Sequence, residues 1–119
     1  MRKFLTFDVK IAVMAVEPTQ RKAEFARRLA SAGYEDFLVL ERETAETVLT
    51  DRRLQLVEAL RATEPASITD LADDLERDVA AVHRDLDTLF EIGVIAYEAD
   101  GGRKRPRLNH EHVFVEPVV

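Results

Sequence analysis

The sequence contains no cysteine and no tryptophan, and it has only four glycines and four prolines in 119 residues. Without cysteine, the chain can form neither disulfides nor thiolate metal sites, and it cannot sense redox state through thiols. No apolar run approaches the roughly 20 residues of a membrane-spanning helix, and no signal-peptide core follows the basic N-terminus. Because 46% of the residues are apolar, we expect one cytoplasmic domain with a packed core.

Motifs of common enzyme sites are also missing. The sequence has no glycine-rich phosphate loop, no nucleophile elbow and no Cys/His cluster. His110-Glu111-His112 could place two imidazoles on one face of a strand, but no third metal ligand is evident. We therefore expect no catalytic residues, no cofactor and no metal, and we predict that the protein is not an enzyme.

Charge is distributed unevenly along the chain, whose formal net charge is −6. Residues 63–100 carry 2 basic and 11 acidic side chains, whereas residues 101–119 carry 4 basic and 2 acidic ones. Contact with phosphates requires Lys and Arg. The acidic segment therefore opposes binding to nucleic acid, and the basic C-terminal segment favours it.

The first third of the chain predicts a strand-helix-strand unit. Residues 4–13 alternate apolar and polar side chains, which predicts a strand whose apolar face (Phe7, Val9, Ile11) lies in a core or a dimer interface. A helix is predicted from Pro18 to Gly33, followed by a short buried strand over 37–40. Because two strands alone are marginally stable, we expect the sheet to recruit the segment 112–119 or a second copy of the chain.

The middle of the chain predicts helices in series. A short helix is expected over 43–49, and Thr50 can cap a second helix over 51–62 that turns Leu54, Val57 and Leu60 inward. Thr69 can cap the next helix, and Asp78 the one after it. The inward positions of these last two helices are Leu71, Ala72 and Leu75, and Val79, Val82, Leu86, Leu89 and Phe90. Two short amphipathic helices joined by a tight turn are typical of a helix-turn-helix.

The segment after Gly93 predicts a β-hairpin. Residues 94–99 are strand-like, 100–102 form a strong turn signal, and 103–108 return as a second strand. Such a hairpin after a helix-turn-helix is the wing of a winged helix, and we expect it to meet a phosphate backbone or a minor groove. The predicted DNA contacts are Arg103, Lys104, Arg105 and Arg107 on the wing, Arg52, Arg53 and Arg77 beside the helices, and Ala80, Ala81, His83 and Arg84 on the second helix.

Residues 77–95 (RDVAAVHRDLDTLFEIGVI) and 101–107 (GGRKRPR) carry a family resemblance. The chain resembles small winged-helix regulators that are common in haloarchaea and distantly similar to MarR- and ArsR-type repressors. The matching positions are Arg77, Asp78, Val79, Val82, His83, Arg84, Leu86, Lys104, Arg105 and Pro106. The resemblance implies a DNA-binding transcription regulator. This chain departs from the pattern at Ala80 and Ala81, where a polar or basic pair is expected, and at Glu76, where many helix-turn-helix turns have glycine.

Together these features predict an α+β winged helix-turn-helix protein with an N-terminal strand-helix-strand unit. Residues 1–42 would form that unit and support dimerisation, and residues 43–119 would form the winged helix with the C-terminal strand. We expect a homodimer that binds double-stranded DNA sequence-specifically and makes no membrane contact. The alternative is a protein-interaction module, antitoxin-like or adaptor, whose acidic helix face meets a basic partner.

Overall fold

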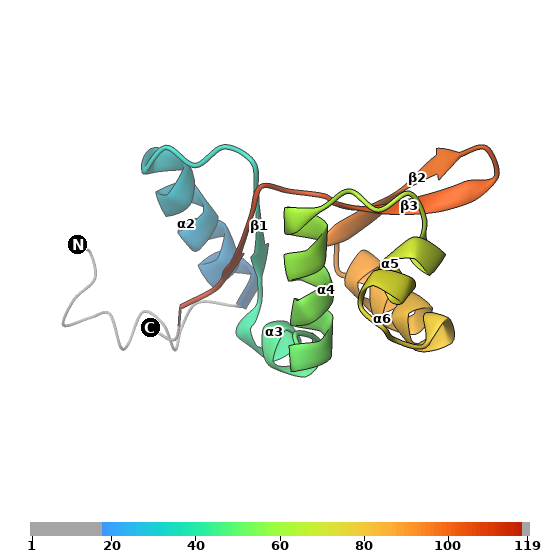
Figure 1. Cartoon of the computed structure of the whole chain (residues 1–119). Coiled ribbons are helices and arrows are strands. Elements are labelled where there is room, and N and C mark those ends of the chain that lie inside the picture. The colour runs from blue at the N-terminus through green and yellow to red at the C-terminus, as the bar shows by residue number, and fades with distance from the viewer. Residues whose placement is uncertain (1–17, 118–119) are drawn as a thin grey trace.

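A computed structural model describes residues 18–117 and shows an α+β fold with two small sheets (Figure 1). In chain order, its elements are α2 (Pro18–Ser31), β1 (Phe37–Leu40), α3 (Arg42–Val48), α4 (Asp51–Ala62), α5 (Ile68–Asp74), α6 (Val79–Glu91), β2 (Ile95–Asp100), β3 (Arg103–Leu108) and β4 (His112–Val115). The predicted strand over 4–13, with its apolar face, lies outside the described residues.

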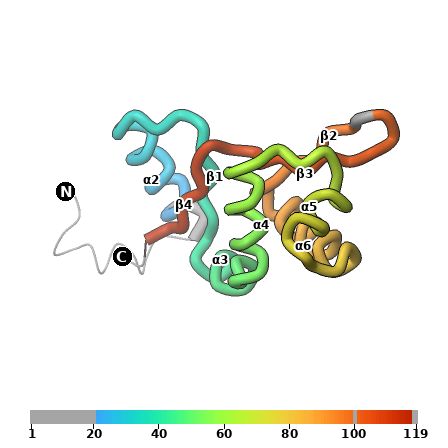
Figure 2. The backbone as a smooth tube through the Cα atoms, viewed as in Figure 1, coloured from blue at the N-terminus to red at the C-terminus, as the bar shows by residue number. Residues whose placement is uncertain are grey.

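The first sheet joins segments from the two ends of the described chain. Strand β1 pairs in parallel with β4, in a register that runs from Phe37 opposite His112 to Leu40 opposite Val115. The predicted recruitment of the C-terminal segment as a strand is therefore confirmed. The sheet lies between α2 on one side and α3 and α4 on the other (Figures 1 and 2).

Aromatic rings fill the layer between this sheet and α2. The ring of Phe114 in β4 makes edge contacts with Phe25 of α2 at 6.4 Å and with Phe37 of β1 at 6.1 Å, measured between ring centroids. Because successive strand residues point to opposite faces, Leu38 and Leu40 instead face the helical core, against which they pack. Each strand of this sheet thus contributes to two apolar layers.

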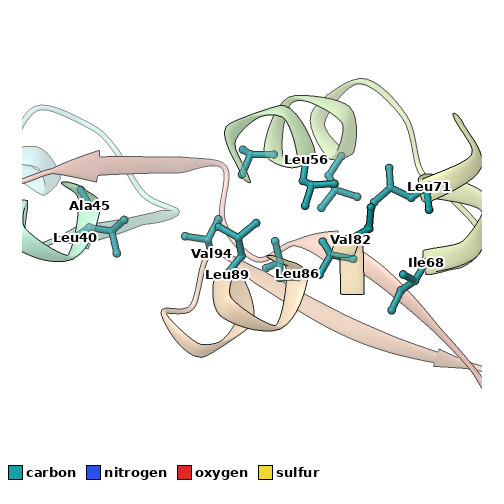
Figure 3. Packing of buried hydrophobic residues seen from close by; sticks show 13 residues of the cluster. Leu40, Ala45, Leu56, Ile68, Leu71, Val82, Leu86, Leu89 and Val94 are labelled. Carbon is teal, nitrogen blue, oxygen red and sulfur yellow. The ribbon is translucent and has the colours of Figure 1, made fainter. Parts of the chain in front are cut away.

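The main core forms where α4, α5 and α6 meet, and Figure 3 shows their side chains converging. Leu56 of α4, Leu71 of α5 and Leu86 of α6 are fully buried. Burying each such leucine stabilises the fold by about 1.5–3 kcal/mol. The core continues into Val94 and Ile95, so the strand that follows α6 is fixed to the three helices.

The inward face of α4 differs from the prediction. Leu54 is 41% exposed, whereas Leu56 is fully buried together with Val57 and Leu60. Residues 53, 56, 57 and 60 form a true helical stripe, since they are spaced i, i+3, i+4 and i+7. The first residue of this stripe is the charged Arg53. The prediction that Leu54 faces inward was wrong.

Side-chain caps begin the helices of the core, and two of the three predictions were right. The Oγ1 atom of Thr50 accepts a hydrogen bond from the Arg53 amide at 3.3 Å, and Oδ2 of Asp78 accepts one from the Ala81 amide at 3.0 Å. The predicted cap at Thr69 is wrong. Ser67 caps α5, because its Oγ accepts from the Asp70 amide at 3.1 Å. The helix therefore begins two residues earlier than the sequence suggested.

Three helices end in the same backbone motif. In each, a residue with positive φ is followed by an amide that bonds to the carbonyl five residues back, as in a Schellman motif. Gly33 (φ 105°) ends α2 and Gly93 (φ 86°) ends α6, but Glu76 (φ 53°) holds this position after α5. Around Glu76, the Arg77 amide bonds to Ala72 O at 2.9 Å. Glu76 is the only non-glycine residue with positive φ between residues 18 and 117.

The second sheet is the hairpin of β2 and β3. The strands are antiparallel, and Asp100 lies opposite Arg103 across a two-residue loop. Gly101 (φ 57°) and Gly102 (φ 86°) both have positive φ, as a type I′ turn requires. The predicted hairpin and its turn are confirmed.

Candidate functional site

Most of the residues predicted to contact DNA lie on α6 and on the β2–β3 hairpin, whereas Arg52 and Arg53 lie on α4 and Arg77 lies between α5 and α6. The start of α6 and the tip of the hairpin point toward the same end of the molecule, away from α2 and the β1–β4 sheet (Figure 1). On α6, Ala80 and Arg84 are exposed, His83 is 47% exposed at its side chain, and Ala81 is half-buried. This end therefore offers an exposed helix face beside an exposed hairpin.

The buried arc of α6 is narrower than the predicted one. Val82, Leu86 and Leu89 are fully buried, as expected, but Val79 is 44% exposed and Phe90 is 49% exposed. Val79 stands at the first position of the helix, before α5 can cover it. Phe90 packs against Tyr97 of β2, with the ring centroids 5.1 Å apart. Both residues border the exposed face and do not belong to the core.

Two of the predicted cationic contacts are held inside the fold by Asp85. The guanidinium of Arg77 donates from Nη2 to Asp85 Oδ2 at 2.7 Å, and Arg53 donates from Nε to Asp85 Oδ1 at 3.2 Å. Arg77 also donates to the Arg52 carbonyl at 3.2 Å, and its side chain is only 5% exposed. These groups tie the α5–α6 turn to α4, and the single Asp85 carboxylate compensates one of the two positive charges. Arg52 itself is exposed on α4.

A second network connects α6 with both strands of the hairpin. The Tyr97 hydroxyl donates to Asp87 Oδ1 at 2.6 Å, and His83 Nδ1 lies 3.1 Å from Asp87 Oδ2. The ammonium of Lys104 lies 5.0 Å from the centroid of the Tyr97 ring, within the range of a cation–π interaction. The hydrogen bond from Tyr97 is the main reason why the pKa of Asp87 is lowered, and burial together with Asp87 raises the pKa of Tyr97.

Carboxylates stand close to the arginines of the hairpin. Arg103 Nη2 lies 3.6 Å from Asp70 Oδ2 of α5, and Glu98 Oε1 lies 3.8 Å from Arg105 Nη2 and 3.5 Å from Arg107 Nε. Arg107 is further engaged, because its Nη1 donates to the Pro65 carbonyl at 3.0 Å. Arg103 and Lys104 are exposed, whereas Arg107 is mostly covered.

Sequence reasoning missed the acidic partners of these cations. The i,i+4 spacing of His83 and Asp87 on one helix could have indicated that pair. The cross-strand position of Glu98 opposite Arg105 could have been read from the hairpin register. Nothing in the sequence indicates the pairing of Asp85 with two arginines from other elements, because it depends on how α4, α5 and α6 pack.

His110 and Glu111 fix the start of β4 by contacting Asp36, which precedes β1. His110 Nδ1 lies 2.8 Å from Asp36 Oδ1, and the Glu111 amide donates to Asp36 Oδ2 at 3.1 Å. The ring of His112 contacts Tyr34 at a centroid distance of 5.2 Å. Among residues 18–117, no three potential ligand side chains come together in a way that could hold a metal ion.

The model of the family HVO_A0114 matches residues 48–115, which covers α4, α5, α6, the hairpin and β4. The chain belongs to this family. No curated protein matches the chain. Within the described part of the chain, no helix is long and apolar enough to cross a membrane.

Proposed function

We propose that α4, α5, α6 and the β2–β3 hairpin form a winged helix-turn-helix that binds double-stranded DNA and regulates transcription. The observation that carries this proposal is the joint exposure of Ala80, His83 and Arg84 on α6 with Arg103 and Lys104 on the hairpin, at one end of the molecule. A helix of this type enters the major groove with its N-terminal half, and the wing contacts the adjacent backbone.

Solvent exposure, more than pairing with carboxylates, divides the predicted cations into two groups. Arg84, Arg103 and Lys104 are exposed and are the proposed phosphate or base contacts, joined by Arg52 and by Arg105, which is partly covered. Arg53, Arg77 and Arg107 are engaged with Asp85, Glu98 and backbone carbonyls, and we assign them to positioning the helices and the hairpin. Ala80 and Ala81 can offer only methyl contacts, for example to thymine.

The proposed active form is a homodimer, because two copies would present two α6 helices to half-sites about one helical turn, roughly 34–36 Å, apart. A dimer also doubles the number of exposed cations that reach DNA, which an acidic protein needs. Sedimentation of the purified protein at micromolar concentration tests this part. A monomeric mass would contradict the dimer without touching the DNA proposal.

The proposal is tested by gel retardation of the DNA upstream of the protein's own gene, at several salt concentrations. We expect retardation at low salt and an affinity that falls steeply as salt rises, since each phosphate contact releases counterions. Replacing Arg103 and Arg105 with alanine should flatten the slope of log affinity against log salt by up to about two units. The matched control replaces Arg27 and Arg28 of α2, which removes the same charge at the other end of the molecule.

The outcomes separate the possibilities. Equal effects of the two double variants would mean that only net charge matters and would remove the hairpin from the interface. If the native protein did not retard the DNA at low salt, the DNA proposal would be wrong.

A second candidate function rests on the acidic side chains of α5 and the turn that follows it. Asp73, Asp74, Glu76 and Asp78 are all exposed on a short stretch, which suits a basic protein partner. This candidate predicts that the native protein changes the anisotropy of a labelled arginine-rich peptide, and that replacing Asp73 and Asp74 with asparagine abolishes the change. The DNA proposal predicts instead that the same replacement leaves DNA binding intact or strengthens it.

A further inference from the structure

The network around Asp87 determines which nitrogen of His83 remains available to a ligand. Asp87 accepts the Tyr97 hydroxyl at Oδ1, at 2.6 Å, and lies 3.1 Å from His83 Nδ1 through Oδ2. Since Nδ1 is occupied by this contact, Nε2 is the ring nitrogen left for a ligand. The side chain of His83 is about half exposed, and it stands one turn into α6, on the part of the helix proposed to meet the major groove.

The same contacts fix the position of the imidazole proton. An ionised carboxylate can only accept hydrogen bonds, and Asp87 is held ionised because the Tyr97 hydroxyl lowers its pKa. His83 must therefore carry a proton on Nδ1 in order to bond to Oδ2. In the neutral imidazole, Nε2 is then a hydrogen-bond acceptor with a free lone pair.

We propose that His83 is a specificity-determining residue that reads a base through Nε2, and that Asp87, held by Tyr97, is the positioning residue that makes Nε2 an acceptor. This inference rests on the proposed DNA-binding function. In the major groove, the donors that an acceptor can read are the amino groups of adenine (N6) and cytosine (N4). The structure thus assigns His83 a preference for adenine or cytosine at the contacted position.

Protonation of the imidazole would reverse this preference. The bond from Nδ1 to Asp87 is made in both charge states, so the ring keeps its orientation while Nε2 changes from acceptor to donor. A donor reads O6 and N7 of guanine or O4 of thymine. The groups that bear on this exchange are the Asp87 carboxylate on α6, the neutral Tyr97 hydroxyl on β2 and the Lys104 ammonium on β3.

The orientation is tested without DNA, by long-range nitrogen–proton correlation NMR of the imidazoles in the full chain. We expect the neutral form of His83 to be protonated at Nδ1 in the native protein. In Asp87→Ala we expect the proton to move largely to Nε2, because the acceptor is lost. The variant Tyr97→Phe keeps the ring and the carboxylate and should retain the Nδ1 proton. A native protein with its neutral His83 protonated at Nε2 would overturn the inference.

The reading role is tested by selecting a binding sequence from duplexes with a randomised centre of about 20 base pairs, long enough for two half-sites. Affinities of the native protein and of His83→Ala are then measured on every single-base-pair variant of the selected duplex. We expect His83→Ala to lose a discrimination of roughly 2- to 10-fold for adenine or cytosine at one position per half-site, as for one neutral hydrogen bond, with the other positions unchanged.

An exposed side chain such as His83 tolerates alanine, and Asp87→Ala provides a second variant in which the same position should lose its preference. Unchanged discrimination in both variants would overturn the inference while leaving the proposed function intact. Failure of the native protein to bind any duplex would overturn both, whatever the NMR result.

Discussion

Glu76, which ends α5, predicts a stabilising substitution. A left-handed backbone costs an L-residue roughly 1–2 kcal/mol, whereas glycine adopts it freely. Glycine also raises the conformational entropy of the unfolded chain, which cancels about 0.4–1 kcal/mol of the stability gained by relieving the strain. We therefore expect Glu76→Gly to raise the free energy of unfolding by about 0.5–1 kcal/mol, and the midpoint of thermal unfolding by about 2–5 °C.

The measurement is chemical and thermal denaturation followed by circular dichroism, with Glu76→Ala as the matched control. Both variants remove the same charge from an acidic stretch, so their difference isolates the backbone effect. The chain supplies its own reference, since Gly33 and Gly93 occupy the same position in two other helices. Gly93→Ala should lose stability through backbone strain alone. The added Cβ would lie 3.8 Å from Leu38, which is an ordinary contact and not a clash. If Glu76→Gly were no more stable than Glu76→Ala, the reasoning would be refuted.

Three further substitutions test the polar networks. Asp85→Ala should cost about 2–3 kcal/mol in urea denaturation, because it leaves one nearly buried guanidinium without its carboxylate; a loss below about 0.5 kcal/mol, as for a surface pair, would contradict this. The Tyr97–Asp87 hydrogen bond stabilises the fold above about pH 4, the pKa range of Asp in the unfolded chain, and this stability is lost as pH falls through the lowered pKa of Asp87. Tyr97→Phe should remove it, so the unfolding free energies of the variant and the native protein should become equal in acid titrations. Glu98→Gln should raise DNA affinity about two- to fivefold at low salt by releasing Arg105, while the exposed control Glu46→Gln on α3 changes it little.

Much of the fold could be predicted because local chemistry determines it. Thr50 and Asp78 cap the helices that the sequence indicated, and Gly101-Gly102 forms the predicted turn. The face of α4 could not be predicted, because a charged residue, Arg53, belongs to its inward stripe only once Asp85 of α6 is there to bind it. Such a pairing depends on tertiary packing and leaves no periodic signal in either helix.

The cations of the candidate site could be predicted from the sequence, whereas among their acidic partners only Asp87 and Glu98 left a signal in it. The basic run 103–107 is visible in the sequence, but its distances to Asp70 and Glu98 depend on where the hairpin meets α5 and how its strands align. The departure at Glu76 was visible as an unusual residue in a tight turn. Its left-handed backbone follows from the close approach of α5 and α6 and could not be known from residue type, since glycine is the usual choice there.

The pairing of β1 with β4 has a consequence for the order of folding. A hydrogen bond joins Asp36 and Glu111 beside the first paired residues of this sheet, and these two residues are 75 positions apart in the chain. By contrast, α4, α5, α6 and the hairpin follow one another directly. Local contacts form early, and the entropy of closing a long loop delays distant ones. During synthesis, the three helices and the hairpin can assemble before β4 is available to pair with β1. The β1–β4 sheet forms only after residue 115 has emerged, and until then the edge of β1 that later pairs with β4 is open to association with other chains.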